Sequence, residues 1–339
     1  MMLDDRHLLR MSDDAGLFEH ACGAIPRREH GYCLDDAARG LVVLSREQDL
    51  TPQLARVQET LFAFTAHAHE HGRFRNRLGY DRRWQDAPGL GDWWGRALWG
   101  LGSTAAHAGR AWLRAEARLL FDAGARRRSP DLRAMVFAAL GAAEVLTRFP
   151  ADEPARALLG AAVTTIGPVP PGRDWPWPEP RLEYANAAVA EVLIAAGALL
   201  PDPAALADGL RALDWLADRQ TREARLSVVP TGGWTPSQSP PGFDQQPIEV
   251  AALAAACARA HAVTGDARWT STVELARAWF LGTNDAGVPL LDRDTGGCGD
   301  GLRADGVNRN QGAESTLAML ATFQLARPRT GALTGAGTA

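Results

Sequence analysis

EYANAAVAEVLIAAG, residues 183–197, places a polar and aromatic start directly before a run of small apolar residues. Five other segments repeat this pattern: GYCLDDAARGLVVL from Gly31, GDWWGRALWGLG from Gly91, SPDLRAMVFAALG from Ser129, FDQQPIEVAALAAAC from Phe243 and NRNQGAESTLAMLA from Asn308. Units that recur along a chain indicate a repeat architecture. We therefore expect six equivalent helices, each preceded by a polar segment.

The segments between these six helices have a different pattern, in which apolar residues recur every three or four positions. One stripe consists of Leu54, Val57, Leu61, Phe64 and Ala68, and a second of Leu206, Leu210, Leu213 and Ala217. A helix with one apolar stripe lies on the outside of a protein, whereas a helix that is apolar all round is surrounded by protein.

Alternating inner and outer helices predict an all-α fold, an (α/α)6 toroid with six inner and about six outer helices. A closed ring cannot be divided without exposing its inner helices, so we expect a single domain over residues 1–327. The Gly-, Thr- and Ala-rich end, residues 328–339, is expected to be a flexible tail.

Composition agrees with a large apolar core and excludes several classes of partner. Hydrophobic residues make up 46% of the 339 residues, and the net charge is −4. This charge gives no electrostatic footprint for nucleic acid. No apolar run is long and unbroken enough to predict a membrane span.

The N-terminus and the cysteines favour a cytoplasmic protein. The start MMLDDRHLLRM has acidic residues where a signal peptide has a basic start and an apolar run, so we expect no signal peptide. The four cysteines, Cys22, Cys33, Cys257 and Cys298, show no paired spacing, which is typical of a reducing compartment.

If the inner helices run parallel, the six polar segments converge on one funnel at one end of the ring. The polar residues that they contribute are Asp35, Asp36, Asp92, Arg96, Arg133, Glu183, Asn186, Asp244, Gln245, Gln246, Glu249, Asn308, Asn310, Gln311 and Glu314. The tryptophans expected there are Trp84, Trp93, Trp94, Trp175, Trp177 and Trp234. Indole faces among carboxylates and amides favour binding of a sugar, which presents C–H faces and hydroxyls.

Each of these residues also has a purely structural interpretation. An Asp or Asn at a helix start is commonly an N-cap, and this applies to Asp35, Asp92, Asp244 and Asn310. Tryptophans are commonly core residues. Asp35 and Asp36 are adjacent, and successive helical residues point about 100° apart, so one could cap the helix while the other faces the funnel.

The carboxylates favour glycoside hydrolysis, which needs a protonated acid and an ionised partner. A helix N-terminus favours the ionised carboxylate, so Asp35, Asp36 and Asp244 are expected to act as base. The acid requires less polar surroundings. Glu314, one turn inside its helix, is the candidate acid, and Glu249 is the reserve. Whether the reaction retains or inverts the anomeric carbon, and whether water or phosphate accepts the glycosyl group, stays open.

Several motifs resemble those of a bacterial six-hairpin glycosidase-like (α/α)6 family whose members are often labelled glycosyltransferase or glycosyltransferase-associated. The motifs are GYCLDDAAR from Gly31, FDQQP from Phe243 and NQGAEST from Asn310, and the resemblance extends from about His30 to Ala326. It implies work on a carbohydrate, such as an oligosaccharide or glycoconjugate, and a glycosyltransferase as partner.

The resemblance also implies site residues. The positions that match are Asp35, Asp36, Arg39, Asp81, Arg82, Arg83, Asp244, Gln245, Gln246, Asn308, Asn310 and Glu314, and Tyr32 and Tyr184 lie within the motifs as further expected sugar contacts. Two segments depart from the family pattern. Asp92-Trp93-Trp94-Gly95-Arg96 replaces DSHGR, and Tyr184-Ala185-Asn186-Ala187 replaces YDNA. Ala185 removes one carboxylate from the funnel.

A carbohydrate-binding accessory domain without catalytic activity is therefore the main alternative, because it would tolerate the loss of an acid. A terpene cyclase would need the acidic motif D-x-D-D, where this chain has Cys33-Leu34-Asp35-Asp36. A zinc enzyme would need Cys and His ligands beside Cys298, and a sugar epimerase would need histidines in the funnel. We expect no metal and no cofactor.

Overall fold

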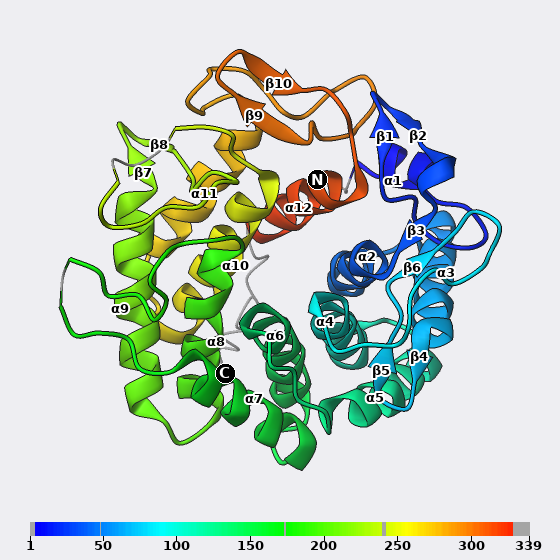
Figure 1. Ribbon diagram of the computed structural model, residues 1–339, viewed down its shortest axis with the longest axis horizontal. Coiled ribbons are helices and arrows are strands. Elements are labelled where there is room, and N and C mark those ends of the chain that lie inside the picture. The colour runs from blue at the N-terminus through cyan, green and yellow to red at the C-terminus, as the bar shows by residue number, and fades with distance from the viewer. Residues whose placement is uncertain (1–3, 48, 173, 239–241, 328–339) are drawn as a thin grey trace, which may run out of the picture.

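The computed structural model describes residues 4–327 except 48, 173 and 239–241, and it forms a ring of helices within a second ring (Figure 1). The inner ring consists of α2 (Leu34–Arg46), α4 (Asp92–His107), α6 (Leu132–Arg148), α8 (Asn186–Leu199), α10 (Pro247–Thr264) and α12 (Ala313–Leu325). Each inner helix contacts the next, and α12 returns to α2, so the ring is closed. The predicted all-α (α/α)6 toroid is confirmed.

The outer ring covers these helices. It consists of α3 (Pro52–Ala68), α5 (Ala111–Ala125), α7 (Glu153–Ile166), α9 (Pro203–Arg219) and α11 (Arg268–Phe280), with the short α1 (Arg6–Met11) against α12. The predicted tail, residues 328–339, lies outside the described residues. No described helix is both long and apolar enough to cross a membrane.

Burial follows the predicted difference between the two rings. Every residue of α8 from Asn186 to Ala196 is buried, whereas α9 buries one stripe. The stripe predicted for α3 is confirmed at all five positions. In α9 the prediction is confirmed at Leu213, whereas Leu206, Leu210 and Ala217 are only half-buried and the residues one position earlier, Ala205, Gly209 and Leu216, are buried. Gly209 lets the backbone of α9 approach Ile194 of α8, and this contact sets the rotation of the helix.

The two ends of the ring differ in the length of their connections. Short turns such as 108–110, 149–152 and 200–202 lead from inner to outer helices, and three outer helices begin at a capping side chain followed by proline. Thr51, Asp152 and Asp202 accept hydrogen bonds from Leu54, Ala155 and Ala205, respectively. Such caps stabilise a helix by about 1 kcal/mol each.

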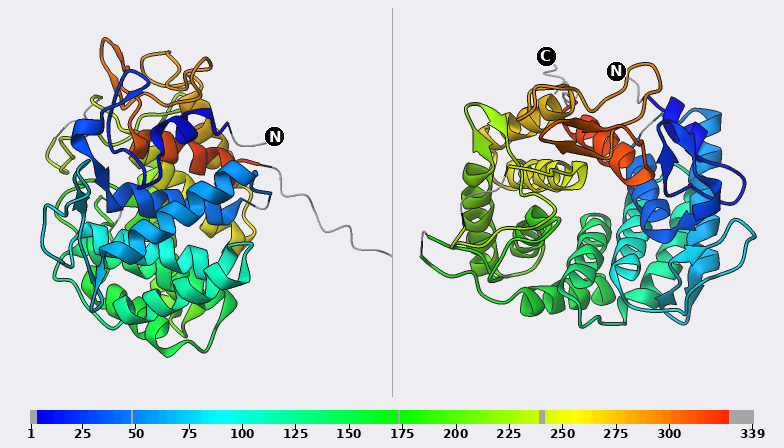
Figure 2. Two further views of the ribbon diagram at one scale, coloured as in Figure 1. Left: turned by 90° about the vertical axis from the view of Figure 1, so that its right-hand side faces the viewer. Right: turned by 45° about the horizontal axis from the view of Figure 1, so that its top comes forward.

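Long segments lead back to the inner helices and gather at the other end of the ring (Figure 2, left panel). They contain five small antiparallel pairs: β1 (Ala21–Cys22) with β2 (Ile25–Pro26), β3 (Tyr32–Cys33) with β6 (Arg77–Leu78), β4 (His69–Glu70) with β5 (Arg73–Phe74), β7 (Thr221–Arg222) with β8 (Arg225–Leu226), and β9 (Gly301–Arg303) with β10 (Gly306–Asn308). Residues that precede all six inner helices thus lie around one opening.

Small residues allow the inner helices to approach closely. A Cβ atom at Gly141 of α6 would lie 2.2 Å from the carbonyl oxygen of Leu98 in α4, and one at Gly102 would lie 2.3 Å from the carbonyl oxygen of Gly141. These distances leave no room for a methyl group against rigid backbone.

We predict that Gly141→Ala separates α4 from α6 and lowers the free energy of unfolding by roughly 1–3 kcal/mol or more, as overpacking does. Gly160→Ala in the outer helix α7 is the matched control, because nothing lies within 4 Å of its added Cβ. That variant should be neutral or more stable by up to about 1 kcal/mol. Urea denaturation of both variants checks this, and equal effects would contradict the close contact.

Candidate functional site

The polar residues at the starts of the inner helices do not serve as N-caps. In the described chain none of the six inner helices has a side-chain hydrogen bond from its own N-cap residue. Asn76 and Asp300 instead bond to the first amides of α2 and α12 from other segments. Asp35, Asp36 and Asp92 lie inside the first helical turn, so the capping interpretation does not explain them.

Five charged residues from three inner helices form a cluster, here called the collar: Asp35, Asp36, Arg39, Arg96 and Glu314. Arg39 of α2 donates to Asp36 at 2.6 Å and also pairs with Glu314 of α12. Arg96 of α4 lies 3.3 Å from an oxygen of Asp35. The guanidinium of Arg39 therefore joins two carboxylates on neighbouring inner helices.

The collar carboxylates differ in exposure. Asp36 is 2% exposed, while the side chain of Glu314 is 38% exposed. Burial raises the pKa of Asp36 to about 7, against the opposing effect of Arg39. This differs from the expectation that the helix N-terminus keeps Asp36 ionised. With a pKa of about 7, Asp36 is partly protonated near neutral pH.

The pKa values of the two collar arginines are shifted in opposite directions. Burial lowers the pKa of Arg96 to about 10, and the positive charge of Arg39 adds to this effect. Burial also disfavours the charged form of Arg39, but Glu314, Asp36 and Asp35 outweigh it and raise its pKa. Arg39 thus stays positively charged between its carboxylates.

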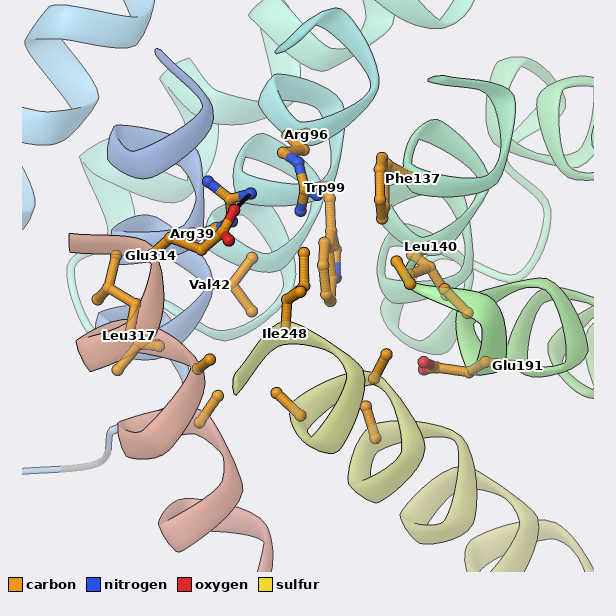
Figure 3. Close-up of a pocket in the computed structure, with 18 of the residues that line it drawn as sticks. Arg39, Val42, Arg96, Trp99, Phe137, Leu140, Glu191, Ile248, Glu314 and Leu317 are labelled. Atoms are coloured by element: carbon orange, nitrogen blue, oxygen red, sulfur yellow. Dashed lines mark hydrogen bonds and ion pairs between the residues drawn. The ribbon is translucent and has the colours of Figure 1, made fainter. Parts of the chain in front are cut away.

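A cavity of about 70 Å³, here called the upper cavity, lies against the collar on the axis of the ring. Arg39, Arg96 and Glu314 line its polar side, and its walls are mostly apolar, including Val42, Leu140, Ile248 and Leu317 (Figure 3). The rings of Trp99 and Phe137 stand parallel in its wall, with centroids 6.2 Å apart. The guanidinium of Arg96 lies over Phe137 at 3.8 Å.

Trp99 has a feature that bears on ligand binding. Its indole nitrogen is buried and has no hydrogen-bond partner in the described structure. A buried donor without a partner is costly, and a ligand oxygen in the cavity would relieve this cost. Trp99 and Phe137 were not among the predicted site residues. They belong to apolar helical runs, where the sequence alone does not distinguish a cavity wall from the core.

A second buried carboxyl, the reserve acid Glu249, has a structural environment. It accepts hydrogen bonds from the backbone of Ala185 and, at 3.0 Å, from the side chain of Asn186. Burial raises its pKa to about 7, although these hydrogen bonds oppose the shift. Glu249 thereby caps α8 from the neighbouring helix and holds Ala185, which has φ 47°, beside the upper cavity.

None of the six predicted tryptophans is among the residues lining the upper cavity. Trp94 and Trp177 are buried, and Trp93 donates to the carbonyl of Phe74. Trp175 and Trp234 pack with Trp215, and Trp84 packs against Phe64 and His67. The structure therefore places these side chains in packing contacts around the ring.

Other predicted residues also lie apart from the collar. Tyr32 is buried and donates to Asp13, Gln245 is buried against Trp279, and Gln311 bonds to Asp292 and Thr295. Arg133 binds Glu179 and the carbonyl of Tyr184. Asp81, Arg82, Arg83, Glu183, Asp244 and Asn310 are exposed, while Tyr184, Gln246 and Asn308 are half-buried. Asp92 is the exception: it lies half-buried in the first turn of α4, near Arg96 and Asp35 of the collar, and burial raises the pKa of its carboxyl.

One group of side chains has the spacing of a metal site. Ligand atoms of Glu19, Cys33 and Asp36 lie within 4.8 Å of one another. Burial raises the pKa of the Cys33 thiol well above its usual value, and Glu19 pairs with Arg77. A protonated thiol is a poor metal ligand, so these residues do not fit a metal ion well.

Comparison of the sequence with protein-family models and with curated proteins finds no match. The fold, however, matches solved structures over nearly the whole chain. A sugar epimerase from a ruminal bacterium is 11% identical with a TM-score of 0.68, covering 94% of each chain. The cellobiose 2-epimerase of Spirochaeta thermophila is 12% identical with a TM-score of 0.69, covering 94% of this chain and 91% of its own.

A D-mannose isomerase is similar as well, with 9% identity, a TM-score of 0.66 and 95% of each chain covered. At these identities the similarity shows the fold, a toroid of the six-hairpin type, and no residue of the site.

The raised pKa of Asp36 predicts a dependence of stability on pH. The folded protein binds this proton more tightly than the unfolded chain, whose carboxyl has the ordinary value of 3.8. The contribution of Asp36 to stability is therefore greatest below about pH 4 and is lost as the pH rises towards 7.

Asp36→Asn removes this titration. Relative to wild type, the free energy of unfolding of the variant should rise by about 2–3 kcal/mol between about pH 5 and about pH 8. Urea denaturation at both pH values measures the difference, with Asp218→Asn on the exposed face of α9 as control. If the free energies of unfolding of Asp36→Asn and wild type changed with pH in parallel, the pKa of Asp36 would not be raised in the folded protein.

Proposed function

We propose that this chain is a carbohydrate-active enzyme that cleaves a glycosidic bond of an oligosaccharide or glycoconjugate at the collar. The observation that carries the proposal is the arrangement of Asp36 and Glu314. The two carboxyls lie on neighbouring inner helices and both bind Arg39. Asp36 is buried with a pKa raised to about 7, whereas the side chain of Glu314 is 38% exposed and lines the upper cavity. Glycoside cleavage requires two carboxyl groups in opposite protonation states.

The environments suggest a role for each carboxyl. Asp36 has a pKa raised to about 7, so it is the proposed general acid. Because Asp36 does not itself line the upper cavity and is covered by Arg39, this role requires Arg39 to move when substrate binds. Glu314 is the more exposed carboxylate and lines the cavity, so it is the proposed base or nucleophile. This reverses the roles expected from the sequence. Asp35 positions Arg96, and Asp244 stays a candidate on the segment before α10.

The upper cavity suits part of a sugar. Trp99 and Phe137 supply flat apolar faces for C–H groups, the free indole nitrogen of Trp99 supplies a donor, and Arg96 supplies a charged donor. Sugar sites commonly combine such surfaces. The similar folds of a sugar epimerase, a cellobiose 2-epimerase and a D-mannose isomerase support a carbohydrate substrate.

The same collar also supports a second candidate, a carbohydrate-binding or accessory domain that works with a glycosyltransferase. Asp35, Asp36 and Glu314 are each paired with arginine, and Ala185 offers no carboxylate to the cavity. Such a site can bind hydroxyls without turnover. In either case we propose action in the cytoplasm, consistent with the four free cysteines.

Turnover separates these two functions. We expect purified protein to release reducing ends from one member of a panel of manno-, gluco- and galacto-oligosaccharides, tested with and without phosphate. Glu314→Gln and Asp36→Asn should each lower turnover by about 100-fold or more, because each removes one acid or base. A requirement for phosphate would identify a phosphorylase.

Glu274→Gln on the outer helix α11 is the control and should retain full activity. A thermal shift with sugar but without release would favour the accessory domain. Wild-type turnover in Glu314→Gln would remove Glu314 from the mechanism.

A further inference from the structure

The opposite end of the ring contains a second cavity, of about 320 Å³, here called the lower cavity. It lies where the inner helices end, and its walls are aliphatic, including Ala195, Leu199, Ala258, Val263 and Leu325. It shares Arg46, Glu191, Ala255 and Leu325 with the upper cavity. An engineered apolar cavity of about 150 Å³ admits benzene, so the lower cavity has room for a small organic molecule.

A network of charged side chains forms one side of the lower cavity. One oxygen of Glu144 accepts from Arg46 at 2.9 Å and from Arg259 at 3.2 Å, and the other oxygen contacts His107 at 2.7 Å. Arg259 also donates to Glu191 at 2.9 Å. Both oxygens of Glu144 and one oxygen of Glu191 therefore have partners.

The second carboxylate oxygen of Glu191 differs from these three oxygens. It is buried and lacks a hydrogen-bond partner among the described residues, and Glu191 as a whole is 3% exposed. Figure 3, which draws the upper cavity, shows this carboxylate extending from α8 toward the axis of the ring, and Glu191 lines both cavities. A buried carboxylate oxygen without a donor is costly, so a donor from a ligand would be strongly favoured at this position.

Charge determines which donor fits best. The two arginines and two glutamates of the network balance one another. The C-terminal ends of the inner helices converge at this end and add partial negative charge, which favours a cation. The aliphatic walls favour a ligand whose remaining part is a short hydrocarbon chain.

We propose that the lower cavity is a binding site for a small aliphatic amine in its protonated form. The ammonium group donates to the free oxygen of Glu191, and the hydrocarbon part packs against Ala195, Ala258 and Leu325. This site lies at the opposite end of the ring from the collar and does not depend on the proposed glycosidic activity.

Calorimetric titration with n-butylammonium tests the site, with 1-butanol and butyrate as the neutral and anionic analogues. We expect the amine to bind more tightly than the alcohol, and butyrate not to bind. Glu191→Gln should weaken the binding of n-butylammonium by about tenfold or more, since a hydrogen bond to a charged group is lost. Gln keeps an oxygen for Arg259.

Ala258→Leu fills the cavity without changing its charge and should abolish binding even if Glu191→Gln proves unstable. Ala207→Leu on the exposed face of α9 is its matched control and should bind as wild type. No binding of n-butylammonium, or equal binding in the Ala258→Leu variant, would overturn the site. Equal affinity for 1-butanol would overturn the role of the ammonium group.

Discussion

The close backbone contact between inner helices is the constraint on which the rest of this structure depends. Gly102 and Gly141 let α4 and α6 approach until a methyl group no longer fits between them, and Gly95 lies equally close to Ala134. Six helices in a closed ring also need small residues toward the axis, because large side chains from all six would collide there. The alanines of α8, α10 and α12 satisfy this requirement and leave the axial cavities partly empty. The same small residues thus allow the ring to close and leave the two cavities along its axis.

The same small residues made the fold predictable from sequence. The alternation of inner helices without a polar face and outer helices with one apolar stripe predicts the double ring. The stripe of α3 from Leu54 to Ala68 is confirmed. The error in α9 shows the limit of this reasoning. Leu206 and Leu210 are larger and more apolar than Ala205 and Gly209, yet the smaller residues are buried. Hydrophobicity alone selected the leucines, whereas α9 approaches α8 closely at two places, Gly209 against Ile194 and Leu206 against Gly197, and this geometry also buries small residues.

Some of the residues that form the collar were predictable from the sequence, but their contacts were not. The polar segments before the inner helices correctly indicated the end of the ring where Asp35, Asp36 and Glu314 meet. Arg39 joins two carboxylates from segments far apart in the sequence, and Trp99 lines the cavity from an apolar run. These contacts depend on how the ring closes. Asn76, Glu249 and Asp300 cap inner helices from distant positions in the sequence. Because such caps cannot be recognised from the sequence, the aspartates at the helix starts were the apparent candidates for N-caps.

The protonation of Asp36 shows how two effects of the same position compete. A helix N-terminus stabilises a carboxylate by about 0.3–1 kcal/mol, and this effect alone predicts an ionised base. Burial raises the pKa of Asp36 from 3.8 to about 7, which corresponds to a free energy on the order of 4 kcal/mol. Desolvation therefore exceeds the helix dipole several-fold, even with Arg39 at 2.6 Å. Glu314 occupies the first turn of α12, but its side chain is 38% exposed and lines the upper cavity. Two first-turn carboxyls on similar helices thus acquire opposite proposed roles because one is covered and the other faces the cavity.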